Sequence, residues 1–331
     1  MMYFFLFFLF CFTGCQNSSP HSSTVHFSQT RMTIDYNIIV GESLNEEKKR
    51  IVQQVIDQVF YEINVTFNKW NSYSEISVIN ALPENTPYHV SPALLQFFNR
   101  IDELVTLSGG LFDPTIEPLQ KLWLVYLKQG LEPPIEEINR IKPSIGWNTI
   151  EIIEGDLIKK DKRTQLDFGG VAKGLCVDML IERLSQEGLS NLYVEWGGEI
   201  RTSGMHPSNR PWRIFISHLG DRDPSKALAF LELNNQALAT SGDYFQYWNV
   251  IDKNGDQKTY CHVFNPLTFS PLEVKVNSIA SASLRAKDCV TADALAKVLM
   301  LFDSTSQAEE WVKYLQNEKG MDVACWIISR N

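Results

Sequence analysis

The chain has 331 residues, of which 44% are hydrophobic and 21% are charged, a composition typical of globular proteins. The formal net charge is -9, which argues against a general nucleic-acid binder, because such a protein needs a basic face for the phosphates. A small anionic ligand would have to be met locally, by a metal ion, a lysine or the N-terminus of a helix.

The first residues predict an export signal rather than part of the fold. Residues 1–13 are uncharged and apolar but too short to span a bilayer as a helix, which is typical of a signal peptide. The stretch Phe12-Thr13-Gly14-Cys15 is similar to a bacterial lipobox. We expect a signal peptide at 1–14, lipidation of Cys15 and a polar tether at 15–29. An ordinary secretory signal cut elsewhere is the alternative, because Phe12 replaces the typical leucine.

The later cysteines give no sign of a metal site. The chain has six cysteines, and those beyond the N-terminal segment are Cys176, Cys261, Cys289 and Cys325. They are isolated and lack CxxC spacing, so we expect small buried side chains rather than zinc ligands. Disulfides are compatible with an exported protein, but the sequence assigns no pairing.

The first half of the chain mixes strand and helix patterns. Residues 30–41 alternate polar and apolar side chains and predict a strand. Residues 46–63 predict a helix because apolar side chains recur at helical spacing, with a core-facing stripe of Ile51, Val55, Val59 and Ile63. Another helix is predicted from the N-cap Ser91 to the glycine pair at 109–110. The proline-bearing segment 130–145 predicts a surface connection, and residues 149–161 predict a hairpin.

The second half predicts one further helix, then several strands and a helical C-terminal region. The helix ends near Gly188, and glycine-marked or proline-marked turns separate the strand-like runs that follow. Residues 290–302 and 306–318 predict helices, and residues 322–329 predict a final strand. Because strands and helices do not alternate regularly, we expect an α+β fold with mixed or antiparallel sheets and packed helices.

Several glycine-rich turns follow predicted strands, and glycine lets a backbone approach a ligand closely. The chain lacks both GxGxxG and GxxxxGK[ST], so neither common nucleotide-binding motif applies. The specific signal is the ordered set of blocks "SEISVIN", "GGLFDPTIEPL", "LDFGGVAKGLCVD", "YVEWGGEIRTSG", "ATSGDYFQYW", "YCHVFNPLTFSP" and "VTADALAKVL". With the lipobox, these blocks resemble the ApbE-type FAD:protein FMN transferases.

The resemblance covers nearly the whole chain after the N-terminal segment and implies a single ApbE-like domain at 30–331. It implies a T-fold-related architecture with an FAD cleft between two lobes. It also implies a transferase that moves FMN from FAD to a threonine hydroxyl of a target protein and releases AMP. Such proteins are membrane-anchored lipoproteins of the bacterial cell envelope that face the periplasm.

The resemblance also implies which residues contact the flavin. The positions that match the family's FAD contacts are Met32, Trp70, Leu111, Phe112, Asp113, Gly169, Lys173 and Phe264. A methionine and an aromatic side chain can sandwich a flat ring system, and tryptophan offers the largest stacking face. Core packing is the alternative role for Met32 and Trp70.

Three residues are candidates for the chemistry. His262 is the candidate base, because its near-neutral pKa suits proton transfer, and Lys173 supplies positive charge beside the phosphates. Asp243 either orients a partner or holds its turn. Asp167 either hydrogen-bonds the adenosine or caps the helix that follows.

The implied Mg²⁺ site departs from the family pattern. The metal-binding positions match the carbonyl of Ala172, the carboxylate of Asp293 and Lys297, where the family has threonine. A charged lysine has no lone pair and cannot replace a hydroxyl ligand. Either Mg²⁺ still binds through fewer ligands, or the Lys297 ammonium occupies the metal's place and meets the phosphates. Asn265 stands where the family usually has aspartate.

Two other functions remain open at the level of the sequence. The altered metal positions raise the alternative of a flavin-binding lipoprotein with little or no transferase activity. A third possibility is an FAD pyrophosphatase, in which water replaces the threonine hydroxyl.

Overall fold

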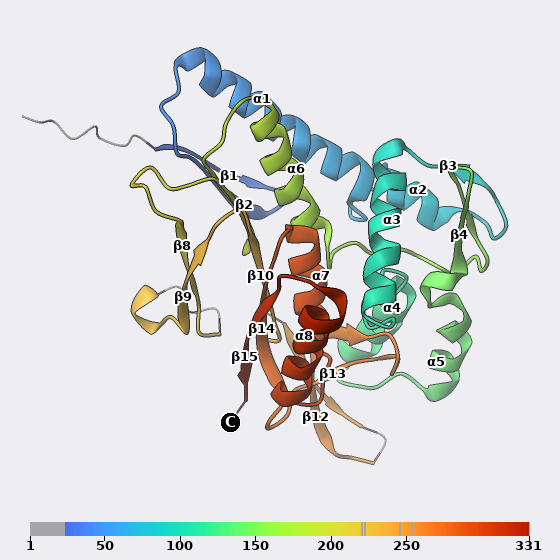
Figure 1. Cartoon of the computed structure of the whole chain (residues 1–331). Helices are drawn as coiled ribbons and strands as arrows, with labels where there is room; N and C mark the ends of the chain where they lie inside the picture. The colour runs from blue at the N-terminus through green and yellow to red at the C-terminus, as the bar shows by residue number, and fades with distance from the viewer. Residues whose placement is uncertain (1–23, 220, 222, 245, 253, 331) are drawn as a thin grey trace, which may run out of the picture.

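The computed structural model describes residues 24–219, 221, 223–244, 246–252 and 254–330 (Figure 1). The helices in this part are α1 (Glu46–Glu62), α2 (Glu75–Ala81), α3 (Pro92–Leu107), α4 (Glu117–Leu127), α5 (Ile135–Ile141), α6 (Ala172–Gln186), α7 (Cys289–Leu299) and α8 (Thr305–Lys319). The strands are β1 (Val25–Arg31), β2 (Ile34–Val40), β3 (Tyr88–His89), β4 (Ile150–Ile153), β5 (Asp156–Lys159), β6 (Leu192–Trp196), β7 (Glu199–Ser203), β8 (Trp212–Ile216), β9 (Ala229–Leu233), β10 (Ala237–Gly242), β11 (Tyr247–Ile251), β12 (Gln257–Asn265), β13 (Ser270–Glu273), β14 (Ile279–Ala286) and β15 (Ala324–Ser329).

A seven-stranded sheet organises the larger part of the molecule. Its order is β1-β2-β6-β7-β10-β14-β15, and each neighbouring pair is antiparallel. Helices α1, α6 and α7 cover one face, where Phe60 of α1 packs on Tyr36 and Trp196 of the sheet. The β8–β9 hairpin packs on the other face through a small apolar cluster that includes Ile214 and Leu238. The predicted α+β class with antiparallel sheets is confirmed.

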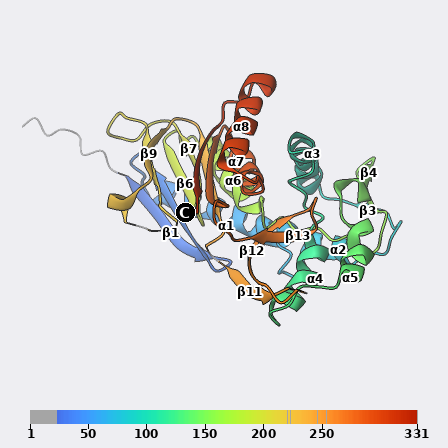
Figure 2. The ribbon, with the colours of Figure 1, turned by 90° about the horizontal axis from the view of Figure 1, so that it is seen from below.

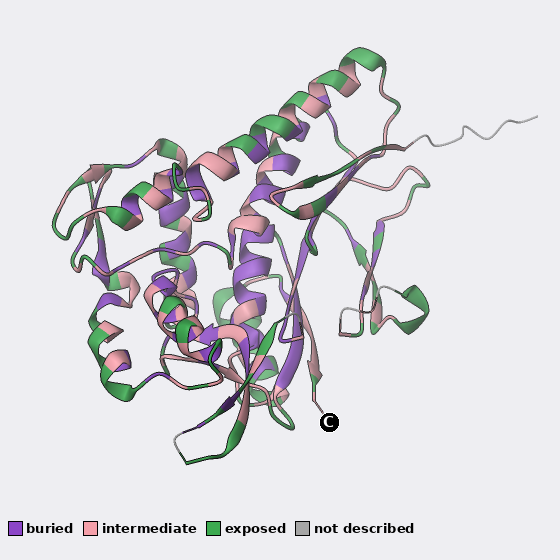
Figure 3. Ribbon diagram, turned by 180° about the vertical axis from the view of Figure 1, so that it is seen from behind, coloured by how far each residue is buried: buried purple, intermediate pink, exposed green. Residues whose placement is uncertain are grey.

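Helix α7 is buried almost throughout, as the purple ribbon in Figure 3 shows. Alanines 292, 294 and 296 are all 0% exposed, and small side chains of this kind allow close packing against the sheet and α6. Lys297 is the one residue of α7 outside the buried set. The helix therefore delivers a single charged side chain to a surface.

A second group of elements lies beside this sheet, on the right in Figure 1, and includes α4 and α5. Helices α4 and α5 share a separate apolar cluster with the β11–β12–β13 sheet, built around Trp123, Leu127 and Tyr260. Figure 2 shows β11–β13 extending from the main sheet toward α4. The described residues thus form two larger apolar cores besides the small cluster at β8–β9, and the candidate site described below is lined from both larger cores.

Most predicted elements are present, with corrections to their boundaries. The single strand predicted at 30–41 is a hairpin that turns at Met32 and Thr33, which have φ values of 49° and 66°. Strand β1 begins at Val25, so part of the predicted tether 15–29 belongs to the sheet. The predicted surface connection 130–145 contains α5.

The structure tests three predicted features of the helices: a cap, a buried stripe and a helix end. The helix from Ser91 is confirmed: the Ser91 Oγ accepts a hydrogen bond from the Leu94 N–H at 3.3 Å. The predicted stripe on α1 is confirmed at Val59 and Ile63, but in the earlier turns the buried residues are Val52 and Ile56 rather than Ile51 and Val55. The α6 helix ends at Gln186, close to the predicted Gly188.

Among the described residues, the four later cysteines are free; Cys176, Cys261 and Cys289 are buried and Cys325 is partly so. No helix in this part is both long enough and apolar enough to cross a bilayer. The predicted signal peptide 1–14 and Cys15 lie outside the described residues.

Candidate functional site

A cavity of about 590 Å³ lies between the two cores. Its walls come from the loop at 69–70, the turn before α4, the start of α6, the end of β10, strand β12 and helix α7. This volume is within the usual range for small-molecule sites. The segments are far apart in sequence, and most carry one of the glycine-rich or aromatic blocks that the sequence analysis singled out.

The structure brings together most of the predicted site residues. The cavity is lined by Trp70, Leu111, Phe112, Asp113, Gly169, Lys173, His262, Phe264 and Lys297. Met32, Ala172, Asp243 and Asp293 are not among the lining residues. The predicted ligand contacts of Met32, Ala172 and Asp293 therefore have no support from the cavity itself.

Met32 lies near the cavity wall rather than in it. It occupies the β1–β2 turn, and its sulfur is 3.8 Å from the side-chain nitrogen of Asn68. Asn68 in turn accepts a hydrogen bond from the Trp70 N–H at 3.1 Å. Met32 thus contacts the loop that carries Trp70.

Trp70 is 86% exposed although it lines the cavity, so its ring presents a free face at the entrance. The ammonium of Lys69 lies 5.1 Å from the ring centroid. Lys69 also pairs with Glu117 and, at 3.0 Å, with Asp167. These two carboxylates fix the lysine, which restrains the loop that holds Trp70. Lys69 was not predicted from the sequence, because its partners Glu117 and Asp167 come from distant segments.

The aspartate of the FDPT turn, Asp113, forms hydrogen bonds within the turn itself. The Asp113 Oδ1 accepts hydrogen bonds from the Thr115 N–H at 2.8 Å and from the Thr115 hydroxyl at 2.7 Å. Burial raises the pKa of Asp113, and the Thr115 hydrogen bonds oppose this. The carboxylate therefore shapes the turn, which brings Leu111 and Phe112 to the cavity.

Asp167 acts similarly just before α6. Its Oδ1 accepts from the Gly169 N–H at 2.7 Å and its Oδ2 pairs with Lys69. The N-cap residue of α6 is Val171, which supplies no side-chain acceptor. Asp167 therefore holds the glycine turn, and the expectation that it caps the helix itself was wrong.

Lys173 projects from the first turn of α6 and pairs with Glu199 of β7. Glu199 is only 1% exposed, and burial raises its pKa to about 7 against the opposing effect of the Lys173 ammonium. For Lys173, burial lowers the pKa, but the carboxylates of Glu199 and Asp293 outweigh it and the net change is upward. Lys173 therefore stays charged beside the cavity. Glu199 was missed from the sequence, although it lies in the "YVEWGGEIRTSG" block.

Lys297 and Asp293 form a pair along α7. The Lys297 Nζ lies 2.5 Å from the Asp293 Oδ1, and the Asp293 Oδ2 accepts a hydrogen bond from the Gly174 N–H at 3.0 Å. Asp293 is 1% exposed, so its two oxygens face only protein donors. The aspartate is thus a buried link between α6 and α7, and the lysine is the group that reaches the cavity.

His262 lies on β12 and lines the cavity. Its Nδ1 is buried and finds no hydrogen-bond partner among the described residues. Burial lowers the pKa of His262, and the charges of Lys297 and Lys173 act in the same direction, against a hydrogen bond with the Gln246 backbone. The imidazole is therefore neutral near pH 7 and able to accept a proton.

Asp243 follows β10 and points to the C-terminal residues instead of the cavity. The guanidinium of Arg330 binds both of its oxygens, with Nη2–Oδ1 at 2.5 Å and Nε–Oδ2 at 3.1 Å. Asp243 is 2% exposed, and its N–H donates to the Ala280 carbonyl at 3.0 Å. Of the two roles considered from the sequence, this geometry favours holding the turn.

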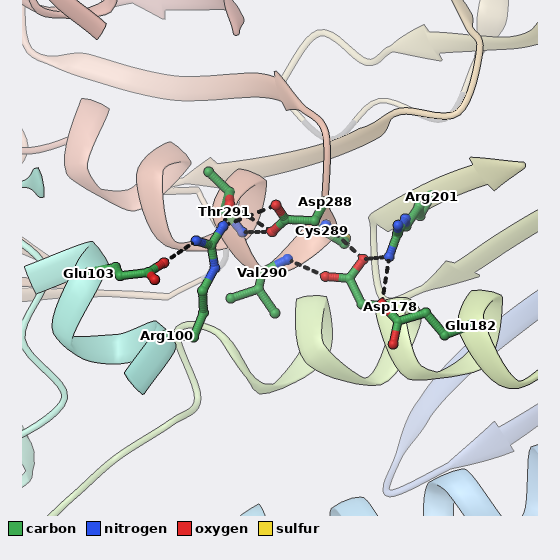
Figure 4. Close-up of polar contacts among 9 residues, drawn as sticks. All are labelled: Arg100, Glu103, Asp178, Glu182, Arg201, Asp288, Cys289, Val290 and Thr291. Carbon is green, nitrogen blue, oxygen red and sulfur yellow. Dashed lines mark hydrogen bonds and ion pairs between the residues drawn. The ribbon is translucent and has the colours of Figure 1, made fainter. Parts of the chain in front are cut away.

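The start of α7 is fixed by a network that Figure 4 shows in close-up. Asp178 of α6 accepts hydrogen bonds from the N–H groups of Cys289 at 2.8 Å and Val290 at 2.9 Å. Arg201 of β7 pairs with Asp178 at 2.7 Å. Asp288 caps the helix by accepting from the Thr291 N–H at 2.8 Å. Because α6, α7 and β7 are tied together, the positions of Asp293 and Lys297 are fixed.

The residues present do not fit a protein-held Mg²⁺ ion. Mg²⁺ demands nearly octahedral oxygen coordination. Both oxygens of Asp293 already accept protein donors, Glu199 is paired with Lys173, and a lysine replaces the expected threonine at 297. Within the described residues, no group of three or more His, Cys, Asp or Glu side chains is arranged to hold a metal. Asn265 uses its Oδ1 to accept from the Leu267 N–H at 2.9 Å, so it shapes its turn.

Comparison with known proteins gives consistent relatives. The ApbE family profile matches residues 29–325. An FAD:protein FMN transferase of Chlamydia pneumoniae is 40% identical over 307 residues, which are 92% of this chain and 92% of the relative. One from Vibrio cholerae is 31% identical and covers 88% of this chain and 85% of its own length.

The same similarity appears among solved structures. The apo flavinyl transferase ApbE of Pseudomonas stutzeri superposes with a TM-score of 0.78 at 25% identity, covering 93% of this chain and 92% of its own. The flavin transferase ApbE of Vibrio cholerae has a TM-score of 0.74 at 26% identity. The profile, the relatives and the folds agree over nearly the whole described chain. This chain belongs to the ApbE family.

Proposed function

We propose that this protein transfers FMN from FAD to a hydroxyl group of an acceptor protein. Family membership supports the reaction class, and the cavity supports its location. FAD has a flat ring system at one end and a pyrophosphate in the middle. The cavity offers an exposed tryptophan face and two lysines in its wall, Lys173 and Lys297.

The observation that carries the proposal is the convergence of these two lysines with a neutral histidine in one cavity. Lys173 comes from α6 and Lys297 from α7, while His262 comes from β12. All three line the cavity. Positive charge beside a pyrophosphate and a base beside an incoming hydroxyl are the requirements of this transfer.

The step is a substitution at phosphorus. The acceptor oxygen forms a bond to the phosphorus of the FMN half, and the bond from that phosphorus to the bridging pyrophosphate oxygen breaks. The hydroxyl proton passes to His262, and AMP leaves with the bridging oxygen. Lys173 and Lys297 stabilise the negative charge that increases on the phosphates as this bond breaks.

Asp243 and Arg330 support His262 indirectly. Their bidentate ion pair fixes the end of β10, and the Asp243 charge acts on His262 by raising its pKa in part against burial. Asp243 is therefore a positioning residue rather than a proton carrier in this proposal. Arg330 plays the same part from the C-terminal end of the chain.

We further propose that the acceptor is a threonine of an extracytoplasmic protein and that Cys15 anchors this protein to the cell envelope, facing the periplasm. The lipobox-like sequence before Cys15 supports the anchor. Incorporation of a labelled fatty acid in cells, lost in Cys15→Ser, is the expected result. Release of the wild-type protein without lipid would contradict it.

The activity is tested with the full-length protein in detergent, FAD and an acceptor domain that carries one candidate threonine. The expected result is a covalently fluorescent acceptor, with the flavin located on the threonine by peptide mass spectrometry. The acceptor with alanine in place of that threonine should stay unlabelled. His262→Gln should retain FAD binding but lose about 100-fold or more in rate.

Two outcomes would contradict the proposal. A wild-type protein that binds FAD tightly but labels no acceptor over a range of metals would be a flavin-binding protein. Retention of the wild-type rate by His262→Gln would remove the histidine from the proton transfer.

A further inference from the structure

Lys297 has an unusual place in α7. The rest of this helix is buried, yet the Lys297 side chain is 30% exposed and lines the cavity. Lys297 is therefore the charged residue of α7 that lines the cavity, and its ammonium is also paired with Asp293.

The ammonium is held from two sides. The Asp293 Oδ1 lies 2.5 Å from its Nζ. Its stem runs along the glycine turn before α6, where a Cβ built at Gly170 would lie 3.2 Å from Lys297 Cδ and 3.3 Å from Cε. Gly170 also lines the cavity. The absence of a side chain at 170 thus leaves room for the lysine stem beside the ligand space.

The Lys297 ammonium pairs with the Asp293 carboxylate, which a metal ion at this position would need as a ligand. The ammonium has three N–H donors, and its acceptors on Asp293 are Oδ1 at 2.5 Å and the backbone carbonyl at 3.4 Å, so one donor remains for an anion in the cavity. A divalent cation near Asp293 would be repelled by the ammonium and would have to displace it. The second carboxylate in the region, Glu199, is engaged by Lys173.

We propose that the Lys297 ammonium replaces the divalent cation, so that FAD binding and FMN transfer by this protein need no divalent metal. The inference rests on the proposed function for its substrate, FAD. It assigns to the chain itself the charge that the family resemblance places on Mg²⁺. A fixed single charge takes the role of a diffusible double charge at the pyrophosphate.

The test measures FAD affinity by equilibrium dialysis, which does not require transfer. The wild type, Lys297→Thr and Lys297→Met are each titrated in EDTA and in excess Mg²⁺. Wild-type affinity should change less than about twofold between the two conditions. Lys297→Thr should lose about tenfold or more in EDTA and regain it in Mg²⁺, whereas Lys297→Met should stay weak in both, since it supplies neither charge nor oxygen.

Lys313→Met is the matched control, because Lys313 is an exposed lysine of α8 outside the cavity, and it should behave as wild type. Thermal unfolding of each variant confirms that it is folded. A wild type whose FAD affinity falls about tenfold or more in EDTA would overturn the inference, as would a Lys297→Thr variant without Mg²⁺ dependence. If no acceptor is labelled in any condition, the proposed function fails while the binding data still decide the role of Lys297.

Discussion

The N-termini of α6 and α7 lie in the same part of the molecule, but only α7 has an N-cap residue with a side-chain acceptor. At α7, Asp288 caps the helix and Asp178 accepts from the N–H groups of Cys289 and Val290. At α6, the N-cap residue is Val171, which has no polar side chain, and the preceding glycine turn lines the cavity.

This difference indicates that the N-terminus of α7 has a structural role, whereas the start of α6 contributes to ligand binding. The N-terminus of a helix carries partial positive charge and free N–H groups, which favour anions. At α7 the protein satisfies these groups with its own carboxylates, so the helix serves as a fixed frame for Asp293 and Lys297. At α6 the N-cap residue supplies no acceptor, although the Asp293 Oδ2 accepts from the Gly174 N–H, and Lys173 in the first turn adds positive charge beside the cavity. The anion of a ligand is therefore expected at α6.

The largest effect is expected on stability, at the N-terminus of α7. Asp178→Ala removes the acceptor of two buried N–H groups and leaves Arg201 without its 2.7 Å partner. The free energy of unfolding should fall by about 3–5 kcal/mol, since two buried N–H groups lose their acceptor and Arg201 keeps only the Glu182 carboxylate at 3.5 Å. Denaturant unfolding measures this.

The control for that prediction is Asp57→Ala, because Asp57 pairs with Arg31 at the surface, where its side chain is 51% exposed. Its loss should cost about 0–1 kcal/mol. Equal costs for the two variants would mean that the network in Figure 4 does not hold α7 in place.

At the start of α6, a substitution should change ligand affinity. Lys173→Met should weaken FAD binding by about tenfold or more but leave riboflavin binding unchanged, because riboflavin has no phosphate. The single variant also leaves the buried Glu199 without its partner, so Lys173→Met is compared with the double variant Lys173→Met/Glu199→Gln. Fluorescence titration with both ligands measures the difference. Equal loss for riboflavin would place Lys173 away from the phosphates.

Trp70→Ala should give a smaller and different effect. Loss of a stacking face should weaken FAD and riboflavin alike, by about threefold to tenfold, because aromatic stacking contributes about 0.5–1.5 kcal/mol. The melting temperature should stay the same, since the side chain is 86% exposed. A change restricted to FAD would show that Trp70 contacts the adenosine half instead of the ring common to both ligands.

The smallest effect is expected in the pH profile. Burial and the two lysine charges lower the pKa of His262 from its ordinary value of 6.5. Because the neutral imidazole is the active form, the acid limb of kcat/KM should lie below pH 6.5. Lys297→Met removes a neighbouring positive charge, so the limb should move to higher pH. A limb that moves to lower pH would contradict this electrostatic coupling.

The order of the predicted elements gave the fold class, whereas most of the cavity residues were predicted through the resemblance to the ApbE-type transferases. Helix caps such as Ser91 and the glycine blocks around 169–170 are readable from neighbouring residues. The missed residues act through distant partners: Lys69 through Glu117 and Asp167, and Glu199 through Lys173. These pairs form only when separate segments meet.

The errors have the same origin. The hairpin at Met32 was missed because two non-glycine residues adopt positive φ there, which residue type alone does not indicate. Asp243 was considered for catalysis as part of the "ATSGDYFQYW" block, but its carboxylate is bound by Arg330 from the far end of the chain. Sequence spacing correctly placed Lys297 beside Asp293, since four residues make one helical turn.

The most direct test of the whole account is the stoichiometry of products from FAD. Full-length protein, FAD and a threonine-bearing acceptor are incubated in EDTA, and AMP, free FMN and labelled acceptor are quantified together. The account predicts equal amounts of AMP and labelled acceptor, little free FMN, and no AMP release when the acceptor is omitted. Release of AMP with an equal amount of free FMN, with or without acceptor, would contradict it and identify hydrolysis of FAD instead.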